Sequence, residues 1–190
     1  FHHHPPAVPD DDACWDMQRA GQESLASRGY RQYEVSAYAR DGQRCRHNLN
    51  YWQFGDYIGI GAGAHGKRTD PHAGTIERRR KPRSPNGYLD ALARGEPLSG
   101  RDLLTPADVV VETMLNGLRL NEGMPLALLT RHSGLPLAWF RTGIEAGVQR
   151  DLLRQDENRL IPTDTGRRFL NDLIGLFLPD PQAPNRSARE

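Results

Sequence analysis

Two short runs of small, aromatic and β-branched residues constrain the fold of this 190-residue chain most strongly. The first is RQYEVSAYA at 31–39, and the second is GDYIGIGAGA at 55–64. Short apolar runs bounded by turn residues are typical of buried strands in a parallel sheet or barrel. Functional groups collect at the ends of barrel strands. We therefore predict an α/β fold in which Tyr38, Ala39 and His65 lie at the rim of a site.

Between the two runs lies HNLNYW, residues 47–52. An imidazole, amides, a phenol and an indole within six residues can ligate a metal, stack on a flat ring and hydrogen-bond its edge. The segment can equally be a structural loop, in which Tyr51 and Trp52 fill core space and His47 bonds a carbonyl. The residues alone leave both interpretations open.

The glycine-rich segment GAGAHG, residues 61–66, matches the pattern G-x-G-x-x-G. A dinucleotide site requires a helix immediately after the glycines. Here the chain continues as KRTDPHAGT, which predicts a turn or hairpin. The segment is therefore either part of another cofactor site or a place of close backbone packing.

The N-terminal segment FHHHPPAVPD predicts extended chain, because its prolines disfavour helix and leave the histidines without chelating geometry. Asp10 then begins a helix that runs to about Ser27, with acidic residues at the positive end of its dipole. Gly29 ends the helix. Residues at helical spacing predict that the helix lies against a sheet; they are Cys14, Met17, Gly21 and Leu25.

Residues 67–83 are the most basic part of the chain, with seven lysines and arginines against Asp70 and Glu77. Arginine pairs with carboxylates in a bidentate manner, so an anion-binding role is one interpretation. A solvated hairpin face is the other. Prolines and glycine then predict a linker over 84–104.

Residues 105–178 predict a separate helical unit. Thr105 caps a first helix, Pro125 and Pro136 open two more, a small hairpin turns near Asp156, and Thr163 caps the last helix. This order is typical of a winged helix. The predicted inward residues are Val111, Met114, Leu115, Leu118, Phe140, Ile144 and Val148. The tail 179–190 predicts disorder.

Winged helices often bind DNA, which supplies a hypothesis of another class. The unit holds eight arginines and nine acidic residues. A DNA-binding face needs a basic footprint. We therefore predict packing against the barrel or docking of a partner protein, and no nucleic acid.

Six segments in order carry a resemblance to a known family. RCRHNLNYW and GDYIGIGAGAHG are the most specific, and LTPADVVVETMLNGLRLNEGMPL and LIPTDTGRRFLND lie among the others. Over about residues 1–178 the chain resembles the oxygen-independent coproporphyrinogen III oxidase-like branch of the radical SAM enzymes, in particular its heme chaperones. The resemblance implies closing strands of a partial TIM-like (β/α) radical SAM barrel in 1–83, the linker, and a winged-helix-like domain in 105–178.

The resemblance also implies site residues. HNLNYW matches the heme-binding motif put forward for the chaperones, so His47 is the expected ligand of heme iron. Tyr51 and Trp52 are expected to contact the porphyrin ring, and Asn48 to fix the local geometry. Binding of S-adenosylmethionine is expected at Ala39, Gly61, Gly63 and His65.

One departure from the family pattern is large. The family holds a [4Fe–4S] cluster with a CxxxCxxC run. This chain has only Cys14 and Cys45, so we expect the C-terminal half of a longer protein, with no catalytic residue of its own and no radical chemistry. Cys45 is expected to be a reduced, partly buried thiol.

The resemblance predicts a heme chaperone whose partners are heme or porphyrin, a client protein and its own missing half. The alternative is an oxygen-independent coproporphyrinogen III oxidase, which performs radical oxidative decarboxylation. A net charge of +1 gives no general attraction to nucleic acid or membrane. Without an apolar run of about 18 residues or a signal peptide, we expect a cytoplasmic location and no membrane span.

Overall fold

The computed structural model describes residues 6–179, a mixed α/β chain in two compact units divided between Cys45 and Arg46. Predictions for the histidines at residues 2–4 and for the tail beyond residue 179 lie outside these residues. None of the helices in the described range is long and apolar enough to span a membrane.

The first unit contains one helix and a hairpin. Helix α1 (Asp11–Ala26) begins as predicted, because the Asp10 carboxylate accepts a hydrogen bond from the Ala13 amide at 2.8 Å. It contacts β1, where Gln22 donates to Gln32 at 3.2 Å, so the prediction that it lies against a sheet holds for a two-stranded sheet, but the helix buries no residue in the described chain. The single strand predicted over 31–39 is wrong. The segment folds as an antiparallel pair, β1 (Arg31–Glu34) and β2 (Ala37–Ala39).

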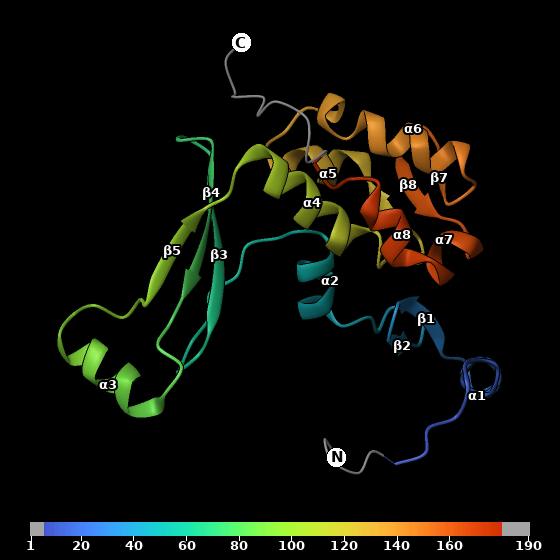
Figure 1. Ribbon diagram of the computed structural model, residues 1–190, viewed down its shortest axis with the longest axis horizontal. Helices are drawn as coiled ribbons and strands as arrows, with labels where there is room; N and C mark the ends of the chain where they lie inside the picture. The colour runs from blue at the N-terminus through green and yellow to red at the C-terminus, as the bar shows by residue number, and fades with distance from the viewer. Residues whose placement is uncertain (1–5, 180–190) are drawn as a thin grey trace. The chain divides into compact units, whose positions relative to one another are not determined.

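The second unit opens with α2 (Arg46–Trp52) and a three-stranded antiparallel sheet in the order β3-β4-β5 (Figure 1). The strands are β3 (His65–Asp70), β4 (Thr75–Arg80) and β5 (Gly100–Leu103). The hairpin predicted after the glycines is therefore confirmed as β3 and β4, and a helix does not follow them. Residues 84–104, predicted to be a linker, are folded into α3 (Pro85–Ala93) and β5.

The run GDYIGIGAGA is not a strand, contrary to the prediction. A single bridge joins Tyr57 to Lys67, with 3.0 Å between the amide nitrogen of each and the carbonyl oxygen of the other. Gly61 has φ +97° and Gly63 φ +69°, conformations that interrupt extended chain. Gly59 lies so close to β3 that a Cβ there would be 2.0 Å from the carbonyl oxygen of His65. Close backbone packing therefore accounts for this glycine.

The rest of the second unit is mainly helical and follows the predicted order. Thr105 and Asp108 form a capping box at α4, and Thr163 caps α7 by accepting from Gly166. A second sheet has the order β6-β8-β7. The elements are α4 (Pro106–Gly117), β6 (Met124–Pro125), α5 (Leu126–Ser133), η1 (Leu137–Trp139), α6 (Arg141–Gln149), β7 (Leu153–Gln155), β8 (Arg159–Pro162), α7 (Asp164–Arg168) and α8 (Leu170–Gly175).

Helix α4 contributes to two cores. Val109 packs with Phe54 and Ile76 beside the β3-β4-β5 sheet. Met114 and Leu118 join the larger helical core, whose members include Phe140, Leu160 and Leu173. Two residues predicted to point inward are exposed instead, Leu115 at 46% and Val148 at 47%. Each lies at the edge of an apolar stripe, where helical spacing does not separate inside from outside.

Candidate functional site

HNLNYW, for which a structural loop was one of two interpretations, forms helix α2. Helical spacing places His47 one turn before Tyr51, and the two rings meet edge to face with centroids 4.8 Å apart. His47 is exposed, whereas Tyr51 and Trp52 are half-buried. The imidazole is therefore accessible to solvent, and the Tyr51 ring packs against it.

Tyr51 continues an aromatic row into the sheet. Its ring centroid lies 4.3 Å from that of Tyr57, whose hydroxyl accepts a hydrogen bond from Arg78 at 2.7 Å. Arg78 forms an ion pair with Glu112 of α4, with 3.0 Å between Nε and Oε2. Burial raises the pKa of Tyr57, and Arg78 opposes that rise. The phenol is thus a neutral group held between Tyr51 of α2 and Arg78 of β4.

Trp52 carries the most unusual polar atom of the site. The guanidinium carbon of Arg119 lies 4.2 Å from the centre of the Trp52 ring, in the geometry of a cation–π contact. The indole Nε1 is buried, and no hydrogen-bond acceptor among residues 6–179 reaches it. Buried donors in native proteins rarely lack a partner, so the unpartnered N–H makes Trp52 a candidate for a residue that binds a ligand.

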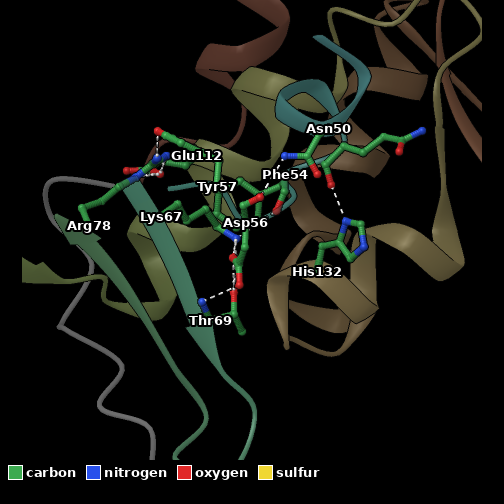
Figure 2. A network of polar contacts seen from close by, with 10 residues as sticks. Asn50, Phe54, Asp56, Tyr57, Lys67, Thr69, Arg78, Glu112 and His132 are labelled. Atoms are coloured by element: carbon green, nitrogen blue, oxygen red, sulfur yellow. Dashed lines mark hydrogen bonds and ion pairs between the residues drawn. The ribbon is translucent and has the colours of Figure 1, made fainter. Parts of the chain in front are cut away.

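The C-terminal end of α2 is held by a network of polar contacts, drawn in Figure 2. Asn50 donates to the carbonyl of Asp56 at 2.9 Å, and Nδ1 of His132 lies 2.6 Å from the carbonyl of Gln53. A Cβ on Gly55 would lie 2.2 Å from the Asn50 side-chain oxygen and 2.9 Å from the Asn50 carbonyl oxygen, so the turn after α2 requires glycine there. These contacts fix the helix against the following loop and α5.

A buried lysine anchors the same loop to the sheet (Figure 2). Lys67 is only 2% exposed, and its Nζ donates to the Phe54 carbonyl at 2.9 Å, to Asp56 at 2.9 Å and to Thr69 at 3.2 Å. We call this group, formed by Lys67, Phe54, Asp56 and Thr69, the Lys67 cluster. All three ammonium hydrogens have acceptors, which is the arrangement expected of a structural cation.

The pKa values in the Lys67 cluster follow from the same contacts. Burial lowers the pKa of Lys67, and Asp56 opposes the change. Burial alone would raise the pKa of Asp56, but hydrogen bonds from Lys67 and Thr69 outweigh it and leave that pKa below its ordinary value. The pair is thus charged at neutral pH.

Sequence reasoning missed Asn50, His132 and the distinct role of Lys67. The tight turn at Gly55 and the two asparagines in HNLNYW were the available signals for Asn50. The role predicted for Asn48 stays a prediction. The four residues expected to bind S-adenosylmethionine lie in both units: Ala39 ends β2, Gly61 and Gly63 lie in the loop before β3, and His65 is exposed at its first position.

The residues present do not fit an iron–sulfur cluster. Cys14 and Cys45 are free and exposed, so the prediction of a partly buried Cys45 is wrong. Within residues 6–179 no group of three or more histidine, cysteine, aspartate or glutamate side chains is placed to hold a metal ion. Thiolate ligation of a cluster cannot be built from this donor set.

Comparison with known proteins gives consistent relatives. Residues 104–169 match the model of the HemN C-terminal domain. Over 180 residues the chain is 41% identical to "Heme chaperone HemW" of Haemophilus influenzae and 41% identical to that of Escherichia coli, with 95% of this chain and 46% of each relative covered. "Heme chaperone HemW" of Mycobacterium tuberculosis is 34% identical over 173 residues, covering 90% of this chain and 41% of the relative. The chain thus spans about half the length of the curated relatives it matches.

A solved structure shares the fold. It is coproporphyrinogen III oxidase (HemN) from Escherichia coli, described as a radical SAM enzyme. The TM-score is 0.62 at 16% identity, and the match covers 89% of this chain and 42% of the other.

Proposed function

The chain belongs to the HemN-related family that includes the heme chaperones HemW, and from this premise we propose that α2 binds heme as the cargo of a chaperone. The observation that carries the proposal is the exposed His47 on a helix whose aromatic neighbours and C-terminal end are fixed. A neutral imidazole is a good axial ligand for heme iron. Because His47 needs no rearrangement of the core to reach a ligand, it is the candidate for that role.

Tyr51 and Trp52 supply the remaining chemistry. An aromatic ring beside the ligand can cover part of a porphyrin face, and an indole N–H can donate to a polar group at the porphyrin edge. The unpartnered Nε1 of Trp52 supports this assignment, since a small shift of the side chain would let a bound group satisfy it. The network at Asn50 and His132 keeps α2 in place and limits the ordering cost of binding.

The finer architecture is part of the same proposal. We assign residues 105–178 to a winged-helix-like domain. The fold likeness to HemN and the order of α4 to α8 around the β6-β8-β7 sheet support this. The closing part of a partial TIM-like barrel, expected in residues 1–83, is not supported by the described strands there, which pair antiparallel. The balanced charge of residues 105–178 favours a protein client over nucleic acid. S-adenosylmethionine contacts at Ala39, Gly61, Gly63 and His65, and a cluster elsewhere in the longer protein, complete the proposal.

The oxidase alternative is less well supported. Relatives at 41% identity are named heme chaperones, whereas the likeness to the oxidase is at 16% identity and concerns the fold alone. Turnover of coproporphyrinogen III by the full-length protein would favour the oxidase.

Titration of the chain with hemin, followed by visible absorbance, tests heme binding. We expect a saturable Soret band of bound heme, and a loss of about 1–3 kcal/mol of binding free energy in Trp52→Ala from the missing ring contact. Trp139→Ala in η1 is the matched control, because Trp139 is 37% exposed and belongs to a different element.

Trp52→Phe keeps an aromatic ring and removes only the N–H. It should bind hemin more tightly than Trp52→Ala does, with both variants shown by circular dichroism to be folded. An absence of saturable binding, or equal losses in the Trp52 and Trp139 variants, would contradict the proposal.

A further inference from the structure

The β3-β4-β5 sheet has two different faces. Side chains alternate along a strand, and paired residues on neighbouring strands share a face. Lys67 pairs with Arg78, and both side chains contact the loop after α2 or the helix α4. We call this the covered face. The other residues of each strand lie on the opposite face, which we call the arginine face.

A pocket of about 780 Å³ is lined by Arg68, Arg79 and Arg101 of the arginine face, and also by Asp56, Lys67 and Thr69. Gly66 pairs with Arg79, and Arg79 pairs with Arg101, so the three form one row across the sheet. Beyond β3 the row continues to Ile58, whose Cα would lie 3.9 Å from a Cβ on Gly66. Since Gly66 has no side chain, the floor of the pocket at this point is bare backbone.

Positive charge exceeds negative charge in this pocket. Arg68, Arg79, Arg101, Lys67 and Lys81 line it, and Asp56, the ion-pair partner of Lys67, is the lining carboxylate. Glu77 lies beside the pocket on β4 and pairs with two of the arginines. Arg79 is 2.8 Å and Arg101 is 3.5 Å from Glu77, whereas Arg68 forms no ion pair within residues 6–179. The hydrogen bond from Arg79 holds the pKa of Glu77 below its ordinary value, so Glu77 is charged but neutralises only one arginine.

Apolar side chains stand beside the arginines. Ile58 is 88% exposed, and Pro97 and Leu98 line another part of the same pocket. Exposed apolar surface next to uncompensated guanidinium groups is suited to a ligand that is both apolar and anionic. The volume lies within the range of roughly 300–1,000 Å³ found for small-molecule sites.

We propose that this pocket binds an organic anion with at least two carboxylate or phosphate groups on an apolar body, held by Arg68, Arg79 and Arg101. Guanidinium groups match both kinds of anion in bidentate geometry. The pocket adjoins the site proposed on α2, because Tyr57 lines it and contacts Tyr51 of α2, and His65 also lines it. The three arginines belong to the β3-β4-β5 sheet and not to α2. A porphyrin with two propionates and a nucleotide with several phosphates both meet this description.

Two ligands distinguish the sources in parallel titrations of the chain. Metal-free protoporphyrin IX, followed by fluorescence, offers two carboxylates and no iron for an imidazole to ligate. ATP, followed by calorimetry, offers phosphates. At least one should bind, and Arg68→Gln with Arg101→Gln should weaken that binding at least roughly tenfold, since each substitution removes a charge-assisted contact to the anion. The dimethyl ester of protoporphyrin IX should not bind.

The matched control is Arg80→Gln with Arg154→Gln, which removes the same charge. Arg80 lies on β4, but its side chain is on the covered face and forms an ion pair with Asp102. Arg154 lies on β7, outside this sheet. This control should leave binding unchanged. Failure of both ligands to bind, or equal binding by the Arg68 and Arg101 double variant and the parent, overturns the proposal. Neither result tests heme ligation by His47, which is measured separately by the absorbance of hemin.

Discussion

The two faces of the β3-β4-β5 sheet use similar residues for opposite purposes. On the covered face, Lys67 forms an ion pair with Asp56, and Arg78 forms one with Glu112. The charge of each cation is therefore balanced by its own carboxylate. On the arginine face, Arg79 and Arg101 share Glu77, and Arg68 forms no ion pair among the residues that the structure describes. Neighbouring positions in the sequence, such as Lys67 and Arg68, thus differ completely in environment.

This difference separates structural charge from binding charge. A buried cation contributes to the fold only when its partners offset the cost of removing it from water. A cation in surplus at a solvent-filled pocket is already hydrated and has little effect on stability, but it attracts anions. The comparison therefore makes opposite predictions for stability and for binding.

The largest effect is expected at Lys67. Lys67→Met removes a cation that is 2% exposed and leaves the Phe54 carbonyl and the Asp56 carboxylate without their donor. We expect the free energy of unfolding to fall by roughly 2–4 kcal/mol, measured in urea. Arg68→Met, one residue along on the other face, should change it by less than about 0.5 kcal/mol. Equal losses in the two variants would remove the distinction between the faces.

A smaller effect is expected for the pair between Arg78 and Glu112. Their side chains are 24% and 29% exposed, so the pair is screened less than a surface pair. A double-mutant cycle with Arg78→Gln and Glu112→Gln should give a coupling energy of about 0.5–1.5 kcal/mol. The pair between Arg80 and Asp102, at 49% and 50% exposed, should couple by less than about 0.5 kcal/mol. A larger coupling in the exposed pair would contradict this order.

The smallest effect concerns pH. The folded pKa of Asp56 lies below its ordinary value of 3.8, so its charge stabilises the fold above that value. The contribution is lost as the pH falls from there through the folded pKa. The parent should therefore have a larger free energy of unfolding in urea than Asp56→Asn at pH 7. The difference between the two free energies should become smaller below about pH 4. A difference that widens on acidification would show that the carboxylate is not stabilised by Lys67.

Local signals in the sequence predicted local structure well. Asp10, Thr105 and Thr163 cap helices where expected, because a cap depends on residues within one turn. The hairpin after the glycines was likewise predicted. Helix α2 was missed although Leu49 and Trp52 have helical spacing, because the polar and aromatic side chains gathered within six residues suggested a binding site and drew attention away from the helix.

Features that depend on distant partners were not predictable in the same way. Lys67 and Arg68 differ only by the face of β3 on which they lie, and that is fixed by pairing with β4 and by the bridge from Tyr57. The second run was taken as a strand because its residues are small and β-branched, but two glycines with positive φ bend it. His132 contacts Gln53, 79 positions away, and no local pattern indicates such a contact.

The most direct test of the proposed function compares two exposed histidines of the second unit, His47 on α2 and His65 at the start of β3. In hemin titrations of the purified protein, His47→Ala should shift or abolish the Soret band of bound heme, while His65→Ala should leave it largely intact. Only ligation by His47, and not a general loss of structure, predicts that contrast. An unchanged spectrum and affinity in His47→Ala would contradict the account, and the iron ligand would then have to be sought outside α2.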